Sequence, residues 1–387
     1  MAINEKIAAF RGEMTAWRRD LHAHPETAYE EHRTAQFVAD KLQEFGIEVV
    51  RGLAGTGVVG VLKGRQEGPG AIGLRADMDA LDIHEQTNRP YASKTPGKMH
   101  ACGHDGHTTM LLGAAKYLAD SRDFSGTAYF IFQPAEESEA GGRVMVEEGL
   151  FERFPMDQVY GMHNWPGLPV GQFGVRDGAM MAANDMFEII VTGHGAHGAM
   201  PNQGIDPIVV AAHIVTGLQT IASRNVDPND ALVITVTQIH GGDAWNVIPE
   251  EVVLRGTVRT FNPKVQDMAE ANISRIARSV AAAFGAEART NYDRRYPATV
   301  NSPAETRHAA RIAAQVNESV SVVEDMAPSM GAEDFAFMLQ KRPGNYIWLG
   351  VGETHPNLHS PHFDFNDEIL PIGASYWARL VEETLKT

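Results

Sequence analysis

The order of strand and helix patterns restricts the possible folds more than any other feature of the sequence. In the first part of the chain, short apolar or β-branched runs lie at 57–62, 71–77, 127–133 and 157–163, with a helical pattern at 108–121 between them. Strands that alternate with helices are typical of a sheet covered by helices on both faces. We therefore expect a three-layer α/β domain whose strands end in polar loops.

The pattern changes near residue 180. From there the order becomes strand, helix, strand, strand, helix, strand, which is the ferredoxin-like βαββαβ unit. Patterns of the first kind resume at 303–387, and a chain of 387 residues exceeds what one hydrophobic core usually organises. We expect a discontinuous α/β domain, 1–179 and 294–387, with 180–293 inserted into it as a second domain.

Charge and composition exclude several classes of partner. The formal net charge is −16, from 33 Lys and Arg against 49 Asp and Glu, so nucleic acid and anionic membrane surfaces would be repelled. No segment approaches the ~18 apolar residues that a membrane span requires, and the N-terminal segment lacks the apolar run of a secretory signal. A single cysteine indicates a reducing compartment. We expect a cytoplasmic protein that acts on small polar molecules.

The stretch HACGHDGH at 100–107 is the strongest chemical signal. It gathers three histidines, one aspartate and the only cysteine of the chain. Thiolate and neutral imidazole are preferred ligands of divalent transition metals, and Cys102 and His104 lie on one short loop. The alternative is a polar loop that caps a helix beginning at Thr108. That alternative explains the glycines of the loop but not the density of ligands.

The stretch FQPAEE at 132–137 places Glu136 and Glu137 directly after a predicted strand. One carboxylate could bind a metal while the other takes a proton from an attacking water, as metal-assisted hydrolysis requires. The alternative is an acidic loop at a helix N-terminus. His163 ends another apolar run, and His362 lies among three histidines before the last helix. A lone histidine is more often an ordinary polar residue, but four such sites at strand ends and loops favour a metal centre.

Two further patterns imitate known motifs. GTGVVG at 55–60 matches a dinucleotide-binding pattern, but the glycines and proline that follow cannot begin a helix, so we expect a hairpin there. HAHPE at 22–26 resembles a metal-binding histidine pair, but it ends an amphipathic helix rather than a buried strand. The nucleophile motif G-x-S-x-G of serine hydrolases does not occur in the sequence.

Longer motifs carry a resemblance to a known family. In chain order they are RADMDAL, HACGHDGHTTMLLGAA, FQPAEE, GMHN, GHGAHGAMPNQGIDPI, NVIPEE, RGTVRTF, SMGAEDFA and LHSPHFDFND. Together they resemble the M20 metallopeptidases over nearly the whole chain. The sequence is most similar to the amidohydrolase branch, which contains hippurate hydrolases, N-acyl-amino-acid amidohydrolases and auxin-conjugate hydrolases. The resemblance implies a zinc-peptidase-like catalytic domain with an inserted lid and dimerisation domain.

The resemblance also implies the chemistry of the site. It implies two divalent metal ions, Mn or Zn first and Co or Ni as further candidates, with Glu136 as the general base. The implied ligands are Cys102, His104, Glu137, His163 and His362. One departure from the wider family is the DMD segment, Asp77 and Asp79, where many relatives have His-x-Asp. The identity of the ligand that bridges the two ions is therefore open.

The resemblance assigns three roles to the inserted domain. His197 would reach the metal centre of a partner subunit, with Asn246, and donate to the developing oxyanion. Arg259 would pair with the α-carboxylate of the substrate, and Arg255 is a weaker candidate for that role. A homodimer, or a dimer of dimers, follows if His197 acts in trans.

The expected reaction is hydrolysis of the amide bond of N-acyl-L-amino acids such as hippurate or N-acetyl-amino acids. The alternatives are a non-catalytic M20-fold binding protein and a dipeptidase or aminoacylase of different substrate range. A degenerate, non-catalytic relative should have lost Glu136 or at least one ligand, and this chain has kept them all.

Overall fold

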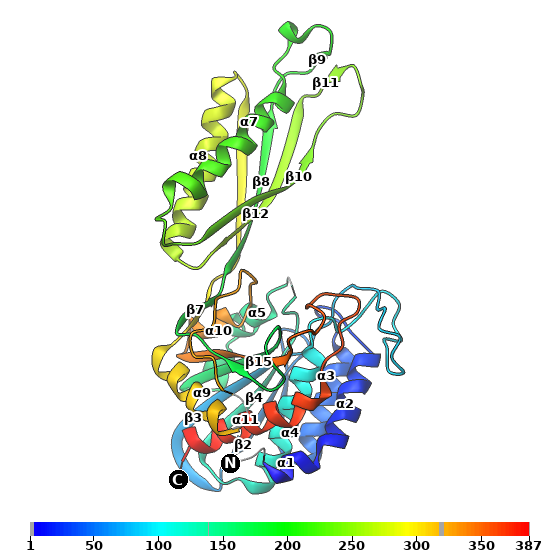
Figure 1. Ribbon diagram of the computed structural model, residues 1–387, viewed down its shortest axis with the longest axis vertical. Helices are drawn as coiled ribbons and strands as arrows, with labels where there is room; N and C mark the ends of the chain where they lie inside the picture. Colours follow the sequence, from blue (N-terminus) through cyan, green and yellow to red (C-terminus); the bar gives the residue numbers. More distant parts are fainter. Residues whose placement is uncertain (1–3, 138, 317–320, 387) are drawn as a thin grey trace. The chain divides into compact units, whose positions relative to one another are not determined.

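The computed structural model describes residues 4–137, 139–316 and 321–386, and the chain divides into two compact units. The first unit comprises Met1–Met180, Val300–Ala327 and Asp334–Thr387, and the second comprises Met181–Thr299 and Pro328–Glu333. Within the described ranges, no helix has the length and apolar character needed to cross a membrane. Figure 1 shows the elements of both units.

The first unit is built on a seven-stranded sheet with the order β1-β2-β4-β3-β5-β15-β6. The four strands β4, β3, β5 and β15 run parallel to their neighbours within this group, whereas β1, β2 and β6 pair antiparallel. The hairpin expected at 55–60 is present: β1 and β2 pair antiparallel, and the turn between them covers residues 54–56. The strands are β1 (Glu48–Leu53), β2 (Gly57–Lys63), β3 (Gln66–Asp77), β4 (Ser125–Gln133), β5 (Gln158–Pro166), β6 (Phe173–Gly174) and β15 (Gly344–Gly352).

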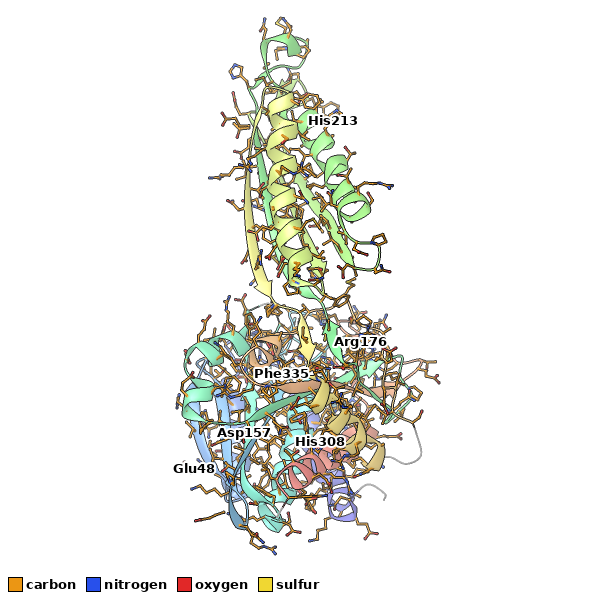
Figure 2. All side chains as sticks on the ribbon, turned by 90° about the vertical axis from the view of Figure 1, so that its left-hand side faces the viewer. Glu48, Asp157, Arg176, His213, His308 and Phe335 are labelled. Carbon is orange, nitrogen blue, oxygen red and sulfur yellow. The ribbon has the colours of Figure 1, made fainter. Side chains whose placement is uncertain are left out.

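Helices cover both faces of this sheet. One face buries Ile72 and Leu74 of β3 against a large apolar cluster formed with six helices, and Figure 1 shows α2 and α11 beside α4. These helices are α1 (Glu5–Ala9), α2 (Arg11–Ala23), α3 (His32–Glu44), α4 (His104–Ser121), α9 (Pro303–Val316) and α11 (Leu370–Thr384). The other face carries α5 (Gly141–Glu147), α6 (Leu150–Arg153) and α10 (Ala336–Leu339). On that face Phe335, labelled in Figure 2, packs against Tyr346 of β15.

The second unit contains β8 (Ala183–Thr192), α7 (Pro207–Thr220), β10 (Leu232–His240), β12 (Glu251–Thr260), α8 (Pro263–Ala283) and β13 (Glu287–Tyr296). Its four strands are antiparallel in the order β10-β12-β8-β13, the ferredoxin-like arrangement. Alternate residues of β12, such as Val252, Leu254 and Val258, are buried in the core beneath the helices. The stacked rings of Phe284 and His213, the latter labelled in Figure 2, lie on the helical side. The predicted fold class, a three-layer α/β domain with a βαββαβ insert, is confirmed.

Small elements complete both units. The pairs are β9 (Ala196–His197) with β11 (Val247–Ile248), and β7 (Gly178–Met181) with β14 (Thr299–Asn301). Single turns of helix lie at Pro201–Gln203, Ile221–Asn225 and Asp367–Ile369. Two details differ from the sequence pattern. The strand β13 continues past residue 293 to Tyr296 through a bulge in its pairing with β8, and the second unit also includes Pro328–Glu333.

Candidate metal centre

The candidate site lies at the carboxyl ends of the parallel strands of the first unit. Asp77 ends β3, Gln133 ends β4 and His163 lies near the end of β5. Carboxyl ends of neighbouring parallel strands meet at one edge of a sheet, where α/β proteins commonly bind ligands. The helix α4 begins at His104, earlier than the predicted start at Thr108, so the HACGHDGH segment spans the loop and the first turn of this helix.

Cys102 and His163 face each other at this edge of the sheet. The Cys102 Sγ lies 3.4 Å from His163 Nε2, and both residues are buried. His163 Nδ1 donates to the Asn164 carbonyl at 2.6 Å, so Nε2 carries the lone pair that faces the sulfur. Burial and the charge of His107 lower the pKa of His163 well below its usual range, which keeps the imidazole neutral. A neutral imidazole held in this way is a competent metal ligand.

Gly103 allows the loop to take this path. Its φ is 94°, and a Cβ atom there would lie 2.1 Å from Asn164 Oδ1. Any side chain at this position would meet both backbone strain and a clash. The two ligand-type side chains Cys102 and His104 therefore flank a position that only glycine fits.

His104 lies in a strongly acidic environment. Its Nδ1 is 3.2 Å from Asp79 Oδ1, and its Nε2 has no hydrogen-bond partner in the described part of the chain, with Asp77 Oδ2 at 3.8 Å. Burial opposes charge on the ring, but Asp77 and Asp79 outweigh it and raise the pKa of His104 to about 10. The ligand atoms of Cys102, His104 and His163 lie within 4.8 Å of one another, a spacing that could hold a metal ion.

The adjacent carboxylates follow β4 and point into the same region. Glu136 is buried, and Glu136, Glu137 and His104 form a second group whose ligand atoms lie within 4.8 Å of one another. Although burial raises the pKa of Glu137, its contact with His359 and the charge of His104 lower it overall. Burial and the charges of Glu137 and Glu136 raise the pKa of the Cys102 thiol well above its usual range. A bound cation would stabilise the negative charges of Glu136, Glu137 and a Cys102 thiolate at such short distances.

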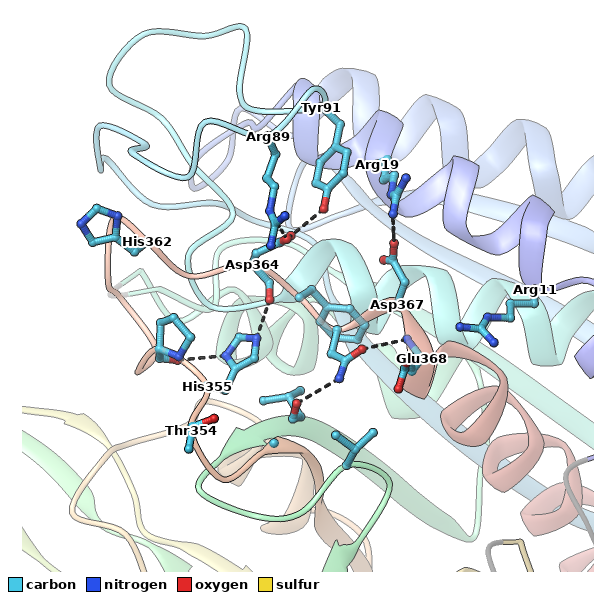
Figure 3. A pocket seen from close by; sticks show the side chains of 16 residues that line it. Arg11, Arg19, Arg89, Tyr91, Thr354, His355, His362, Asp364, Asp367 and Glu368 are labelled. Atoms are coloured by element: carbon cyan, nitrogen blue, oxygen red, sulfur yellow. Dashed lines mark hydrogen bonds and ion pairs between the residues drawn. The ribbon is translucent and has the colours of Figure 1, made fainter.

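The prediction for His362 does not fit the structure. His362 is exposed, its Nδ1 lies 3.3 Å from the Gln86 carbonyl, and it lines a surface pocket with Arg89 and Asp364, as Figure 3 shows. His359, although its side chain is 54% exposed, lies beside the other ligand-type groups: its Nε2 is 3.1 Å from Glu137 Oε1, and it groups with Cys102 and Glu137 within 4.8 Å.

The backbone of the loop that contains both histidines accounts for the position of His359 beside Glu137. His359 has a left-handed φ of 63°, and its N–H donates to the Ala101 carbonyl at 2.8 Å, which ties the turn to the loop of Cys102. Three histidines, His355, His359 and His362, share this segment, and no local pattern distinguishes them. The third ring is held elsewhere, with His355 Nε2 at 2.6 Å from the Asp364 carbonyl.

Arg75 and His107 support the site through Asp77, and neither was assigned a role from the sequence. Asp77 contacts Arg75 Nη1 and His107 Nδ1, each at 2.6 Å, and the Asn164 N–H donates to His107 Nε2 at 3.0 Å. Burial raises the pKa of Asp77, but the charges of His104 and Arg75 lower it well below its usual range. The spacing could have revealed both residues. Arg75 shares a strand face with Asp77, and His107 lies one helical turn after His104.

The remaining predicted residues belong to the second unit. His197 in β9 pairs with Val247 of β11, and the Gly198 N–H donates to the Asn246 carbonyl at 2.7 Å, so His197 and Asn246 are neighbours. The half-buried Arg259 pairs with Asn184 at the start of β8, whereas β9 follows the other end of that strand. Within the second unit, the structure therefore brings His197 and Asn246 together but does not bring Arg259 to them.

Comparison with known proteins agrees with this geometry. A family model described as peptidase family M20/M25/M40 matches residues 73–383. The chain is 40% identical to N-acetylcysteine deacetylase of Bacillus subtilis over 98% of both chains, and 40% identical to hippurate hydrolase of Campylobacter jejuni over the whole of both. A crystal structure of a dinuclear metal-binding M20 peptidase from Bacillus subtilis superposes with a TM-score of 0.86 at 38% identity, covering 98% of this chain and 99% of that one. The chain belongs to peptidase family M20/M25/M40, in its amidohydrolase branch.

Proposed function

We propose that this protein is a metal-dependent amidohydrolase that cleaves N-acyl-L-amino acids into a carboxylate and a free amino acid. The observation that carries the proposal is the convergence of thiol, imidazole and carboxylate groups beside a buried second carboxylate, Glu136. The names of the relatives, a deacetylase of N-acetylcysteine and a hydrolase of hippurate, support an N-acyl-amino-acid substrate.

The donor set fits two divalent cations. The proposed ligands are Cys102, His104, His163, Glu137 and His359, which fall into two groups of candidate ligand atoms that share Cys102. When bound, the two cations would polarise the scissile carbonyl and acidify the attacking water. One thiolate among imidazoles and carboxylates suits Mn or Zn, and also Co or Ni.

The protein's own residues would move the protons and bind the substrate. Glu136 would accept a proton from the attacking water and deliver it to the leaving nitrogen. His197 and Asn246 would donate hydrogen bonds to the developing oxyanion, which is worth a few kcal/mol of the barrier. Arg259 would pair with the substrate carboxylate.

A homodimer is part of this proposal, with His197 supplied by the partner subunit. The second unit supports it, because β10 is an edge strand of the sheet and apolar side chains nearby are exposed. Ile239 and Val247 are more than half exposed, and Trp245 is fully exposed. Exposed apolar groups beside an unpaired strand edge are typical of a protein–protein interface. The lone cysteine, buried at the site, is consistent with a cytoplasmic location.

The test is a hydrolysis assay on hippurate, other acyl-glycines and a panel of N-acetyl-amino acids. The protein is first treated with a chelator and then supplied with Mn, Zn, Co or Ni. We expect hydrolysis with at least one metal and none after chelation. Binding of acyl-amino acids without turnover under every metal would instead indicate a binding protein, and a preference for dipeptides with a free amino group would indicate a peptidase.

A further inference from the structure

The segment that carries Glu136 and Glu137 is held by three buried carboxylates to which the proposed mechanism gives no role. Glu31 accepts the Ala135 N–H at 2.9 Å, Asp79 accepts the Glu137 N–H at 2.9 Å and Asp334 accepts the Gly142 N–H at 2.7 Å. All three side chains are at most 1% exposed. Burying a carboxylate is costly unless its partners compensate, so three of them around one loop require an explanation.

Glu31 holds the residue directly before the proposed base. One oxygen, Oε1, accepts both the Ala135 N–H and the Tyr29 N–H, the latter at 3.0 Å. The other oxygen accepts the hydroxyl of the buried Thr56 at 2.7 Å. A single carboxylate therefore joins a loop before α3, the turn before β2 and the loop after β4.

Both backbone groups that meet at Oε1 belong to strained residues. Tyr29 has a φ of 62° and Ala135 a φ of 54°, in the left-handed region that residues with a Cβ atom seldom adopt. Such strain persists only where the surroundings hold it, and it concentrates at functional sites. Two contacts hold the Ala135 backbone: its N–H donates to the Glu31 carboxylate, and its carbonyl accepts the Gly141 N–H at 2.9 Å. The Glu31 contact is the one made by a side chain, and the next residue along the chain is Glu136.

Glu31 does not serve the helix that follows it. It occupies the N-cap position of α3, yet its side chain makes no capping hydrogen bond. The carboxylate of Glu26 accepts the N–H groups of Arg33 and Thr34 instead, at 3.0 and 2.8 Å. Burial and the charge of Asp79 raise the pKa of Glu31 to about 7, which shows that this position is unfavourable for a carboxylate.

We propose that Glu31 is a positioning residue for the general base: by holding the Ala135 peptide in its left-handed conformation, it aims Glu136 at the reaction centre. The role deepens the proposed amidohydrolase function and rests on it. Glu31 does not touch the reacting atoms, so it would act on kcat through the placement of Glu136. Misplacing a catalytic group by about 1 Å can cost about 100-fold in rate.

The test compares Glu31→Ala with Glu31→Gln. The amide of glutamine can still accept both N–H groups with its oxygen and donate to the Thr56 hydroxyl with its nitrogen, so it keeps the geometry without the charge. We expect Glu31→Ala to lower kcat by about 10- to 100-fold with KM and metal content nearly unchanged. Glu31→Gln should remain within about threefold of the wild type. Glu26→Ala, which removes a carboxylate that binds backbone N–H groups of α3 alone, is the matched control.

A second measurement does not depend on activity. Hydrogen exchange of peptides covering 134–142 in the metal-free protein should become at least about tenfold faster in Glu31→Ala, and remain slow in Glu31→Gln and Glu26→Ala. If Glu31→Ala does not fold, Thr56→Val, which removes one donor to the same carboxylate, should give a smaller acceleration. Unchanged exchange and kcat in Glu31→Ala would overturn the proposal, as would equal losses in the Gln variant. An inactive wild type would refute the amidohydrolase function, while the exchange experiment would still test the contact.

Discussion

At the scale of single residues, three of the proposed ligands, His163, His104 and Glu137, make a further hydrogen bond to a residue beside the site. The Asn164 carbonyl fixes the tautomer of His163, and Asp79 accepts both the Glu137 N–H and a hydrogen bond from His104. Partners of this kind orient metal ligands and raise their basicity, and their loss commonly weakens metal binding about 10- to 100-fold. The site is therefore arranged before any cation binds.

A substitution at Glu136 tests the catalytic step separately from metal binding. Glu136→Gln keeps the shape of the side chain but removes its ability to take a proton. We expect metal content to stay at the wild-type value while kcat falls by about 10²- to 10⁴-fold. Elemental analysis and the hydrolysis assay measure the two quantities on the same sample. Retained activity in this variant would mean that another group is the base.

A pair of variants separates His359 from His362. His359→Ala removes a group whose Nε2 lies 3.1 Å from Glu137, so we expect at least one metal ion to bind about 100-fold more weakly. His362→Ala changes an exposed ring in the same loop and should leave metal affinity within about threefold. Calorimetric titration of each metal-free variant with the metal ion measures these affinities. The opposite order of effects would restore His362 as the ligand.

At the scale of elements, α2 and α4 are joined by a buried ionic cluster beside the site. His22 of α2 contacts Asp105 of α4 at 2.8 Å and Glu85 at 3.3 Å, and Arg18 adds a second cation near Asp105. Burial opposes the charge of His22, but the hydrogen bonds to Asp105 and Glu85 raise its pKa to about 9. The HAHPE segment thus supports the helix that begins with His104 and supplies none of the grouped ligand atoms.

The cluster predicts a pH dependence of stability. The pKa of His22 is about 9 when folded and about 6.5 when unfolded, so the folded state binds the proton more tightly. Its contribution is fully present below pH about 6.5 and is lost as pH rises through about 9, a change of about 3 kcal/mol. Denaturant unfolding of wild type and His22→Gln, both treated with a chelator, measures it at pH 6 and pH 10. A difference between the two proteins that is equal at both pH values would contradict the prediction.

At the scale of the whole molecule, one chain provides the candidate metal centre in its first unit and His197 and Asn246 in its second. The second unit folds around its own apolar core and includes the short strand pair β9 and β11, in which His197 and Val247 are exposed. Under the proposed function, assembly of two chains is required for full activity. The oligomeric state is therefore a test of mechanism as well as of architecture.

Ile239→Asp places a charge on the exposed face of the edge strand β10, where the side chain is 59% exposed. We expect this variant to sediment as a monomer with an intact fold and a kcat reduced at least about 10-fold, because His197 can no longer act in trans. Val170→Asp, an exposed apolar position of the first unit, is the control and should leave the sedimentation unchanged. A fully active monomer would rule out the role in trans.

Local patterns in the sequence were sufficient to predict the fold class and several residues of the candidate site. Alternation of strand and helix patterns predicted the three-layer domain and the βαββαβ insert, because apolar periodicity records which face of each element is buried. Cys102 and His104 are two residues apart, and Glu136 and Glu137 are adjacent, so the members of each pair are close because they are near neighbours in the chain. His163 was predicted to end a strand, and its role as a ligand was implied by the family resemblance.

Other features were decided by the tertiary structure alone. His359 and His362 have no distinguishing local pattern and both are exposed, but the His359 N–H donates to the Ala101 carbonyl and its ring lies beside Glu137, whereas the His362 ring does not. The contact of Glu31 with Ala135 likewise joins segments 104 positions apart. The direction of a side chain depends on backbone angles, and in these loops contacts with distant parts of the chain hold those angles in a strained region that no local preference favours.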